Sequence, residues 1–262
     1  MRGEAMTTEH RDTFDKVAAE YHAVRPAYPE ALFAELAEVA GGAGARVLEV
    51  GCGSGQATRG FLDRGWEVVA VDPGAELVGL AKASLAGRPV AFHVGRFEAF
   101  APEPAGFRLV ASAQAWHWVD PAVGFGKVVE ALAPGGWFAV FGHVPMPPGP
   151  EILARVEPIY REIAPELWGG TTPEAWYLPE GPVSAMIEAT GLFGPVIHRA
   201  YGWSEQTNAA GLARQLGTRS YYNLLPADRR DRLLAEVEKA LTPLGEFAMD
   251  HETHLHRAAL RF

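Results

Sequence analysis

Five short apolar runs, separated by segments of helical length, constrain the fold of this 262-residue chain more than any other feature. Each run is rich in β-branched and aromatic residues, which favour strands. The runs are residues 46–51, 67–72, 90–95, 108–114 and 137–144. Between them, residues 55–63, 74–86 and 121–133 have the length and apolar spacing of helices. Because strands that alternate with helices usually pair in parallel, we expect a doubly wound, mostly parallel sheet.

Further elements are predicted on both sides of these runs. Apolar residues at helical spacing predict helices over residues 29–40, 151–163, 182–190, 206–222 and 227–241. Alternating patterns predict strands near 195–203 and 250–260. Prolines concentrated in 145–150 interrupt the rhythm of strands and helices. We therefore expect an insertion over 145–180 that is not a separate domain.

Composition excludes several classes of function. The net charge is −9, so the chain lacks the basic field that binds phosphate backbones, and we expect no nucleic-acid partner. The first ten residues are polar and no apolar run is long enough for a bilayer, so we expect a cytoplasmic protein without a membrane partner. Cys52 is the single cysteine, which excludes an intramolecular disulfide and a multi-cysteine metal site. We therefore predict no metal.

A glycine-rich segment lies where the first predicted strand turns into a helix. It reads Glu49-Val50-Gly51-Cys52-Gly53-Ser54-Gly55. A backbone that passes close to a bound nucleoside cannot carry side chains at the contact, and a sharp turn can require a positive φ, which glycine adopts at little cost. Gly51, Gly53 and Gly55 meet both needs, so the segment predicts a nucleoside site.

Two carboxylates accompany this segment. Asp72 ends the second predicted strand, where an acidic side chain can accept both hydroxyls of a ribose. Glu49 lies inside the first strand, where its charge favours a ligand that carries an ammonium and a sulfonium. The ligand so indicated has a ribose and a positive charge but no phosphate.

Two other interpretations remain open at this point. A nicotinamide oxidoreductase shares the glycine turn and the acidic strand end, but its fingerprint places the third glycine where Gln56 stands. A protein that binds the cofactor without catalysing a reaction would carry the same residues.

The glycine segment, Asp72 and the stretch Ala111-Ser112-Ala113-Gln114-Ala115-Trp116-His117-Trp118 together resemble the class I S-adenosylmethionine-dependent methyltransferases. Within that family the similarity is to the small-molecule branch that includes trans-aconitate methyltransferase-like proteins. It covers residues 14 to about 145 and extends to the pattern at 218–221. The resemblance implies a Rossmann-like sheet of seven strands, S-adenosylmethionine as cofactor, and in-line methyl transfer to a small-molecule acceptor.

The resemblance also implies which residues bind the cofactor. They are Tyr21, Arg25, Glu49, Gly51, Cys52, Gly53, Gly55, Asp72, Pro73, Phe97, Glu98, Ala113 and Gln114. Asp72 would hold the ribose, and the turn at 96–98 would lie beside adenine, although Arg96 departs from the small or acidic residue usual in the family. Tyr21 and Arg25 would close over the cofactor carboxylate, to which a guanidinium can bind in bidentate fashion.

His117, at the end of the fourth predicted strand, is the candidate catalytic residue. If the acceptor is a hydroxyl or a carbon acid, a general base helps, and histidine titrates near neutral pH. The alternative is that His117, between Trp116 and Trp118, only forms a wall of the cofactor pocket.

We predict one methyltransferase domain over residues 1–262. Residues 1–45 would close over the cofactor, 46–144 would form the cofactor-binding core, 145–180 would form an inserted cap, and 181–262 would complete the sheet and the substrate cover.

Overall fold

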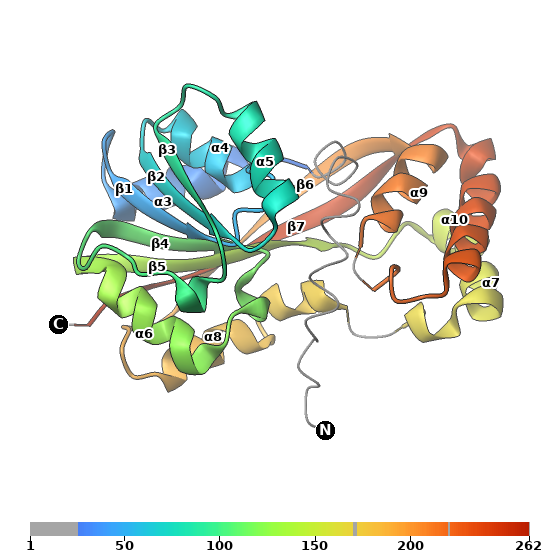
Figure 1. The fold of residues 1–262 in the computed structure, drawn as a ribbon. Coiled ribbons are helices and arrows are strands. Elements are labelled where there is room, and N and C mark those ends of the chain that lie inside the picture. The colour runs from blue at the N-terminus through green and yellow to red at the C-terminus, as the bar shows by residue number, and fades with distance from the viewer. Residues whose placement is uncertain (1–25, 170–171, 220, 262) are drawn as a thin grey trace. The chain divides into compact units, whose positions relative to one another are not determined.

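The computed structural model describes residues 26–169, 172–219 and 221–261. Within these residues, seven strands form one mixed sheet in the order β3-β2-β1-β4-β5-β7-β6 (Figure 1). The strands are β1 (Arg46–Val50), β2 (Glu67–Asp72), β3 (Val90–Val94), β4 (Phe107–Ala113), β5 (Leu132–Pro145), β6 (Ile197–Asn208) and β7 (Glu246–Ala259). The predicted Rossmann-like α/β sheet of seven strands is confirmed.

β1 lies where the strand order reverses. It pairs in parallel with β2, where Val47 lies opposite Val68, and with β4, where Val47 lies opposite Leu109. β3 and β5 extend the parallel part outward from β2 and β4. In open sheets of this kind, ligands bind beyond the carboxyl ends of the strands where the order reverses. The carboxyl ends of β1 and β4 are therefore the expected place for a site.

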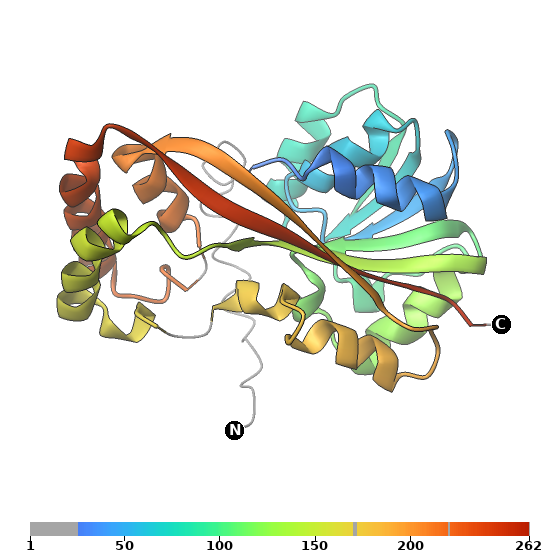
Figure 2. The ribbon, with the colours of Figure 1, turned by 180° about the vertical axis from the view of Figure 1, so that it is seen from behind.

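Within the described part of the chain, five helices cover the two faces of the parallel strands. They are α3 (Glu30–Ala40), α4 (Gln56–Asp63), α5 (Ala75–Ser84), α6 (Pro121–Ala131) and α8 (Pro182–Ala189). Successive strand residues point to opposite faces, so Val47 packs in one core with α3, α4 and α5, and Leu48 in another with α6 and α8. Figures 1 and 2 show the two helix layers on opposite sides of the sheet.

Several predicted boundaries differ from the structure, and two of them have a clear local reason. The helix predicted to reach residue 133 ends at Ala131, because Pro134 disfavours helical dihedral angles at the residue before it. The helix predicted from residue 206 begins at Ala209, because β6 continues to Asn208. The Asn208 side chain then accepts a hydrogen bond from the Gly211 backbone and caps the helix.

The described chain divides into two compact units. The sheet unit comprises residues 26–144, 174–201 and 253–261, and the helical unit comprises residues 145–169, 172–173, 202–219 and 221–252. Three of the boundaries fall within β5, β6 and β7, so each of these strands begins in one unit and ends in the other. The segment 145–180, predicted as one insertion, contributes to both units, and the single-domain organisation stays a prediction.

The helical unit is built from α7 (Pro150–Ile163), α9 (Ala209–Gly217) and α10 (Ala227–Leu241). Apolar side chains at helical spacing form its own core. They include Ile152, Val156, Tyr160, Leu212, Leu233 and Val237.

The 3₁₀ helices of the described chain are η1 (Phe97–Ala99), η2 (Trp116–Trp118), η3 (Pro165–Leu167), η4 (Pro173–Tyr177) and η5 (Thr242–Leu244).

Candidate functional site

The glycine-rich segment forms a tight turn between β1 and α4. Gly51, Gly53 and Gly55 have φ values of +76°, +52° and +91°, a region that other residues adopt only at a cost. At Gly51 a Cβ atom would also lie 2.1 Å from the Cβ atom of Ala115, so no side chain fits there. The Gly51 N–H donates to the Val71 carbonyl at 2.7 Å, which joins the turn to the end of β2.

Two backbone groups orient the Asp72 carboxylate at the carboxyl end of β2. The Gly53 N–H donates to Oδ2 at 2.9 Å, and the Gly74 N–H donates to Oδ1 at 2.8 Å. Asp72 is 8% exposed. A carboxylate offers about four acceptor positions, and these two bonds use one on each oxygen and so fix its orientation. An oriented carboxylate at this strand end is what binding a ribose diol requires.

Glu49 lies inside β1 and is 1% exposed. The Thr58 hydroxyl, from α4, donates to its Oε2 at 2.6 Å, whereas Oε1 has no hydrogen-bond partner within the described residues. Burial, and to a lesser degree the negative charge of Asp72, raises the pKa of Glu49 to about 8. A buried acceptor without a partner costs free energy, which a cationic ligand beside it would offset.

Cys52 and Pro73 flank these carboxylates. Cys52 is buried, and its burial raises the thiol pKa well above the usual range, with the charges of Glu49 and Asp72 acting in the same direction. The thiol therefore stays protonated at neutral pH and is not a nucleophile. Pro73 is exposed beside Asp72. Both residues can contribute shape to a cofactor site, but no charge.

The turn after β4 brings further predicted residues to the same edge of the sheet. Ser112 donates from its hydroxyl to the Val50 carbonyl at 2.9 Å and so joins the ends of β4 and β1. Ala113, the last residue of β4, is half-buried. Gln114 has a φ of +53°, which is uncommon for a residue with a side chain, and residues in such conformations are enriched at functional sites.

Tyr28 is a neighbour of this turn that the sequence analysis missed. Its hydroxyl donates to Gln114 Oε1 at 3.2 Å. Its ring stacks on His143, with 4.3 Å between the ring centroids, and meets Phe141 edge-on at 4.9 Å. No sequence signal pointed to Tyr28, because 86 residues separate it from Gln114 and no motif spans that distance.

The turn after β3 forms η1. Phe97 is buried, and its ring centroid lies 6.3 Å from that of Trp116. Glu98 Oε1 accepts a hydrogen bond from the Asp120 backbone at 2.9 Å, so this oxygen faces the start of α6. The assignment of Phe97 and Glu98 to an adenine site stays a prediction.

His117 lies in η2, immediately after the β4 turn, and is half-buried among aromatic rings. The ring centroids of Trp118 and Trp176 lie 4.9 and 5.8 Å from that of His117. The His117 Nδ1 atom lies 3.1 Å from the Tyr177 hydroxyl oxygen. The candidate base is thus held among rings in the sheet unit.

Other residues singled out from the sequence belong to the helical unit or fall outside the described residues. Tyr21 and Arg25 fall outside the described residues. Asn223, just after the pattern at 218–221, donates from Nδ2 to the carbonyls of Gly217 and Arg219 at 3.3 and 3.1 Å.

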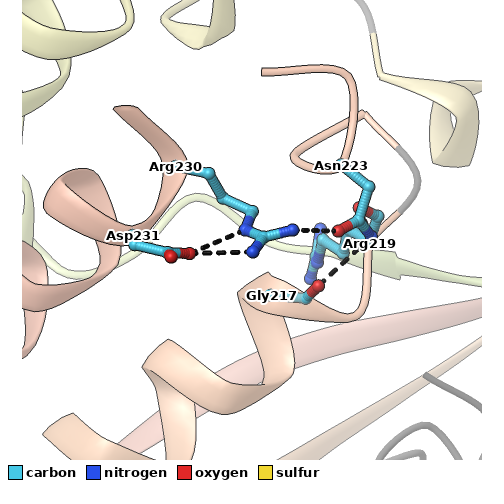
Figure 3. Close-up of polar contacts among 5 residues, drawn as sticks. All are labelled: Gly217, Arg219, Asn223, Arg230 and Asp231. Carbon is cyan, nitrogen blue, oxygen red and sulfur yellow. Dashed lines mark hydrogen bonds and ion pairs between the residues drawn. The ribbon is translucent and has the colours of Figure 1, made fainter. Parts of the chain in front are cut away.

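Arg230 of α10 extends this contact. It donates to Asn223 Oδ1 at 3.1 Å and also pairs with Asp231 (Figure 3). Within the helical unit, these bonds fix the end of α9 to α10.

Among the described residues, no three His, Cys, Asp or Glu side chains gather closely enough to hold a metal ion. None of the described helices combines the length and the apolarity that crossing a bilayer requires.

The region that holds this geometry matches a known family. Residues 47–136 match the sequence model of a family described as "Methyltransferase domain", and this range includes the glycine turn, Asp72 and the β4 turn. The fold is that of the class I S-adenosylmethionine-dependent methyltransferases, as the resemblance implied.

Individual relatives agree with this assignment. The chain is 37% identical over 134 residues to an uncharacterized methyltransferase of Mycobacterium tuberculosis, covering 50% of this chain and 53% of the relative. The chain therefore spans about half the length of the curated relatives it matches. Among solved structures, it is similar to a protein described as a type II methyltransferase from Anaeromyxobacter dehalogenans, with a TM-score of 0.63 and 26% identity over 90% of this chain and 97% of that one.

A third similarity concerns the fold alone. Phosphoethanolamine N-methyltransferase 2 of Haemonchus contortus, solved in complex with S-adenosyl-L-methionine, matches with a TM-score of 0.56 and 17% identity. The match covers 100% of this chain and 62% of that one.

Proposed function

We propose that this chain is an S-adenosylmethionine-dependent methyltransferase that acts on a small-molecule acceptor. The proposal rests above all on the Asp72 carboxylate, which two backbone N–H groups orient at the carboxyl end of β2 beside the glycine turn. The match of residues 47–136 to a methyltransferase domain supports the same function.

The residues at this edge fit S-adenosylmethionine in charge as well as in shape. Glu49 presents a buried carboxyl whose Oε1 has no partner within the described residues, which suits a ligand with an ammonium and a sulfonium. Among the described residues, a Cβ atom on Gly53 would meet no atom within 4 Å. Asp72 would hold the ribose, and Gly51, Gly53 and Gly55 would keep side chains away from the methionine part.

The bound cofactor would supply an activated methyl group. The work of the chain is then to align an acceptor with that group and to exclude water, and such alignment alone can account for a large part of the rate enhancement. Ala113 and Gln114, at the β4 turn, would line the reacting end of the site.

A nicotinamide oxidoreductase fits the turn less well. Its third glycine permits close approach of the helix to the strand and would stand at position 56. Gln56 is instead the first residue of α4, and its side chain bonds to the Ser54 hydroxyl at 3.0 Å.

The test is methyl transfer together with cofactor preference. The full chain, incubated with S-adenosylmethionine labelled in its methyl group and a cell extract of small molecules, should yield a labelled product. S-adenosylhomocysteine should raise the melting temperature, because a ligand at 100 times its Kd stabilises the folded chain by about 2.7 kcal/mol. NAD should leave the melting temperature unchanged.

Other outcomes would favour the alternatives. Stabilisation by NAD alone would contradict the proposal. Binding of S-adenosylhomocysteine without transfer to any acceptor in a broad panel would instead support a non-catalytic binder. The trans-aconitate-like branch, the cytoplasmic location and the absence of a nucleic-acid partner remain predictions from the sequence.

A further inference from the structure

The β4 turn, which leads into the segment that carries His117, packs against the glycine turn. Ala115 lies so close to Gly51 that a Cβ atom on Gly51 would approach its Cβ atom to 2.1 Å. The positive φ of Gln114 turns the chain at this point, and η2, with His117 at its centre, follows two residues later. The imidazole is thus carried by a segment in direct contact with the proposed donor site.

Tyr177 reaches this imidazole from a distant part of the sequence. Its hydroxyl oxygen lies 3.1 Å from His117 Nδ1, although 60 residues separate the two. Tyr177 is 1% exposed, and its ring packs against Gly142 of β5. A Cβ atom on Gly142 would lie 2.7 Å from atoms of this ring. The glycine at position 142 therefore makes room for the tyrosine ring.

The backbone of Tyr177 is also fixed. Its carbonyl accepts a hydrogen bond from His256 Nε2 at 2.8 Å, and His256 Nδ1 lies 2.8 Å from the Ser184 hydroxyl. Burial lowers the pKa of His256 to about 4, so this ring is neutral at physiological pH. With Nε2 donating, Nδ1 must accept from Ser184, and the ring holds one orientation.

We propose that Tyr177 is a positioning residue that orients the His117 imidazole through Nδ1, so that His117 Nε2 faces the acceptor as general base. The proposed role requires the tautomer in which His117 Nδ1–H donates to the Tyr177 hydroxyl oxygen, because Nε2 then carries no proton and can accept one. This inference rests on the proposed methyltransferase function.

The proposed methyl transfer requires an acceptor that carries an ionisable O–H or N–H group. The acceptor atom forms a bond to the methyl carbon, the bond from that carbon to sulfur breaks, and the electron pair stays on sulfur as a neutral thioether. The acceptor proton passes to His117 Nε2, which becomes imidazolium and later releases the proton to water. A carboxylate acceptor has no such proton and would not need His117.

The first test detects the contact between the Tyr177 hydroxyl and His117 Nδ1 directly and does not depend on catalysis. In ¹⁵N spectra of the histidine-labelled full chain, the His117 ring signals are assigned by their loss in His117→Gln. Tyr177→Phe keeps the ring against Gly142 but removes the hydroxyl, so the Nδ1 signal should move. Tyr201→Phe is the matched control, because it removes a hydroxyl that donates to Glu35 at 2.5 Å in the same unit, and it should leave the His117 signals in place.

The second test measures the steady-state kinetics of methyl transfer. Tyr177→Phe should lower kcat about 10- to 100-fold, as misplacement of a reacting group does, and should leave the KM for S-adenosylmethionine within about twofold. An unmoved Nδ1 signal, or an unchanged kcat, would overturn the proposal. If the signal moves but the wild-type chain transfers no methyl group, the contact stands while the proposed function, and with it the role of His117 as base, fails.

Discussion

At the scale of single residues, the candidate site contains two carboxyl groups with different surroundings. Asp72 receives two backbone hydrogen bonds, whereas Glu49 is buried with one hydrogen bond from Thr58. Burial disfavours the charged form, so Glu49 keeps its proton to a higher pH than an exposed glutamate. A cation bound beside Glu49 would favour the ionised form and so release this proton.

The raised pKa of Glu49 predicts a particular dependence of stability on pH. The unfolded chain ionises Glu49 near its ordinary pKa of 4.5, but the folded chain does so only near 8. Between these values the unfolded state has lost the proton and the folded state has not. The contribution of Glu49 to the free energy of unfolding is therefore complete below about pH 4.5 and falls by up to about 1.4 kcal/mol per pH unit as the pH rises towards 8.

Urea unfolding of the wild type and Glu49→Gln at pH 5, 6.5 and 8 measures this contribution. The wild type should lose stability relative to Glu49→Gln as the pH rises. Glu76→Gln, at an exposed position on α5, is the control and should track the wild type. If the Glu49→Gln curve ran parallel to the wild type, Glu49 would not keep its proton in the folded chain.

How well single residues could be predicted depended on the distance along the chain. The position of Asp72 followed from the sequence, because a strand end next to a glycine turn is a local pattern. Tyr28 and Tyr177 could not be predicted, because their contacts with Gln114 and His117 cross 86 and 60 residues. Such contacts depend on how the elements pack, which local patterns do not encode.

At the scale of elements, the turn between β1 and α4 depends on glycine for two separable reasons. Gly51 has a positive φ, and the space where its Cβ atom would lie is occupied by Ala115. Gly87 has nearly the same φ, +78°, but a Cβ atom there would meet no atom of the described residues within 4 Å. The two glycines therefore separate backbone strain from steric overlap.

Alanine substitutions at the two glycines should differ in their effects. Gly87→Ala should cost about 1–2 kcal/mol of stability from backbone strain alone. Gly51→Ala should cost about 1–3 kcal/mol more, because the β4 turn must move, and it should also weaken S-adenosylhomocysteine binding. Urea unfolding and calorimetry measure both effects. Equal losses of stability would mean that the approach of Ala115 to Gly51 is not a tight contact.

Most elements could be predicted because their patterns are local. The starts of β1, β2 and β3 agree with the prediction, as do both ends of α10. The boundary between β6 and α9 could not be placed, because polar residues such as Gln206 and Asn208 suit either a partly exposed strand or a helix start. In the folded chain, the hydrogen bond from the Gly211 backbone to the Asn208 side chain fixes the start of α9.

At the scale of the whole molecule, the division into two units could not be predicted from the sequence. A domain boundary usually shows as a flexible linker of polar residues, glycine or proline. Here three boundaries fall inside the strands β5, β6 and β7, so the sequence continues its strand pattern across them. The proline-rich segment 145–150 marks one boundary, the one at the end of β5.

The central claim is that the Asp72 carboxylate binds the ribose of an S-adenosyl cofactor, and titration calorimetry of the full chain with S-adenosylhomocysteine tests it most directly. The wild type should bind, and Asp72→Asn should bind about 10- to 150-fold more weakly, which corresponds to about 1.5–3 kcal/mol for a hydrogen bond to a charged group. Asp63→Asn removes the same charge at an exposed position on α4, where Asp63 pairs with Arg88, and should bind like the wild type. No binding by the wild type, or equal affinity of Asp72→Asn and the wild type, would contradict the claim.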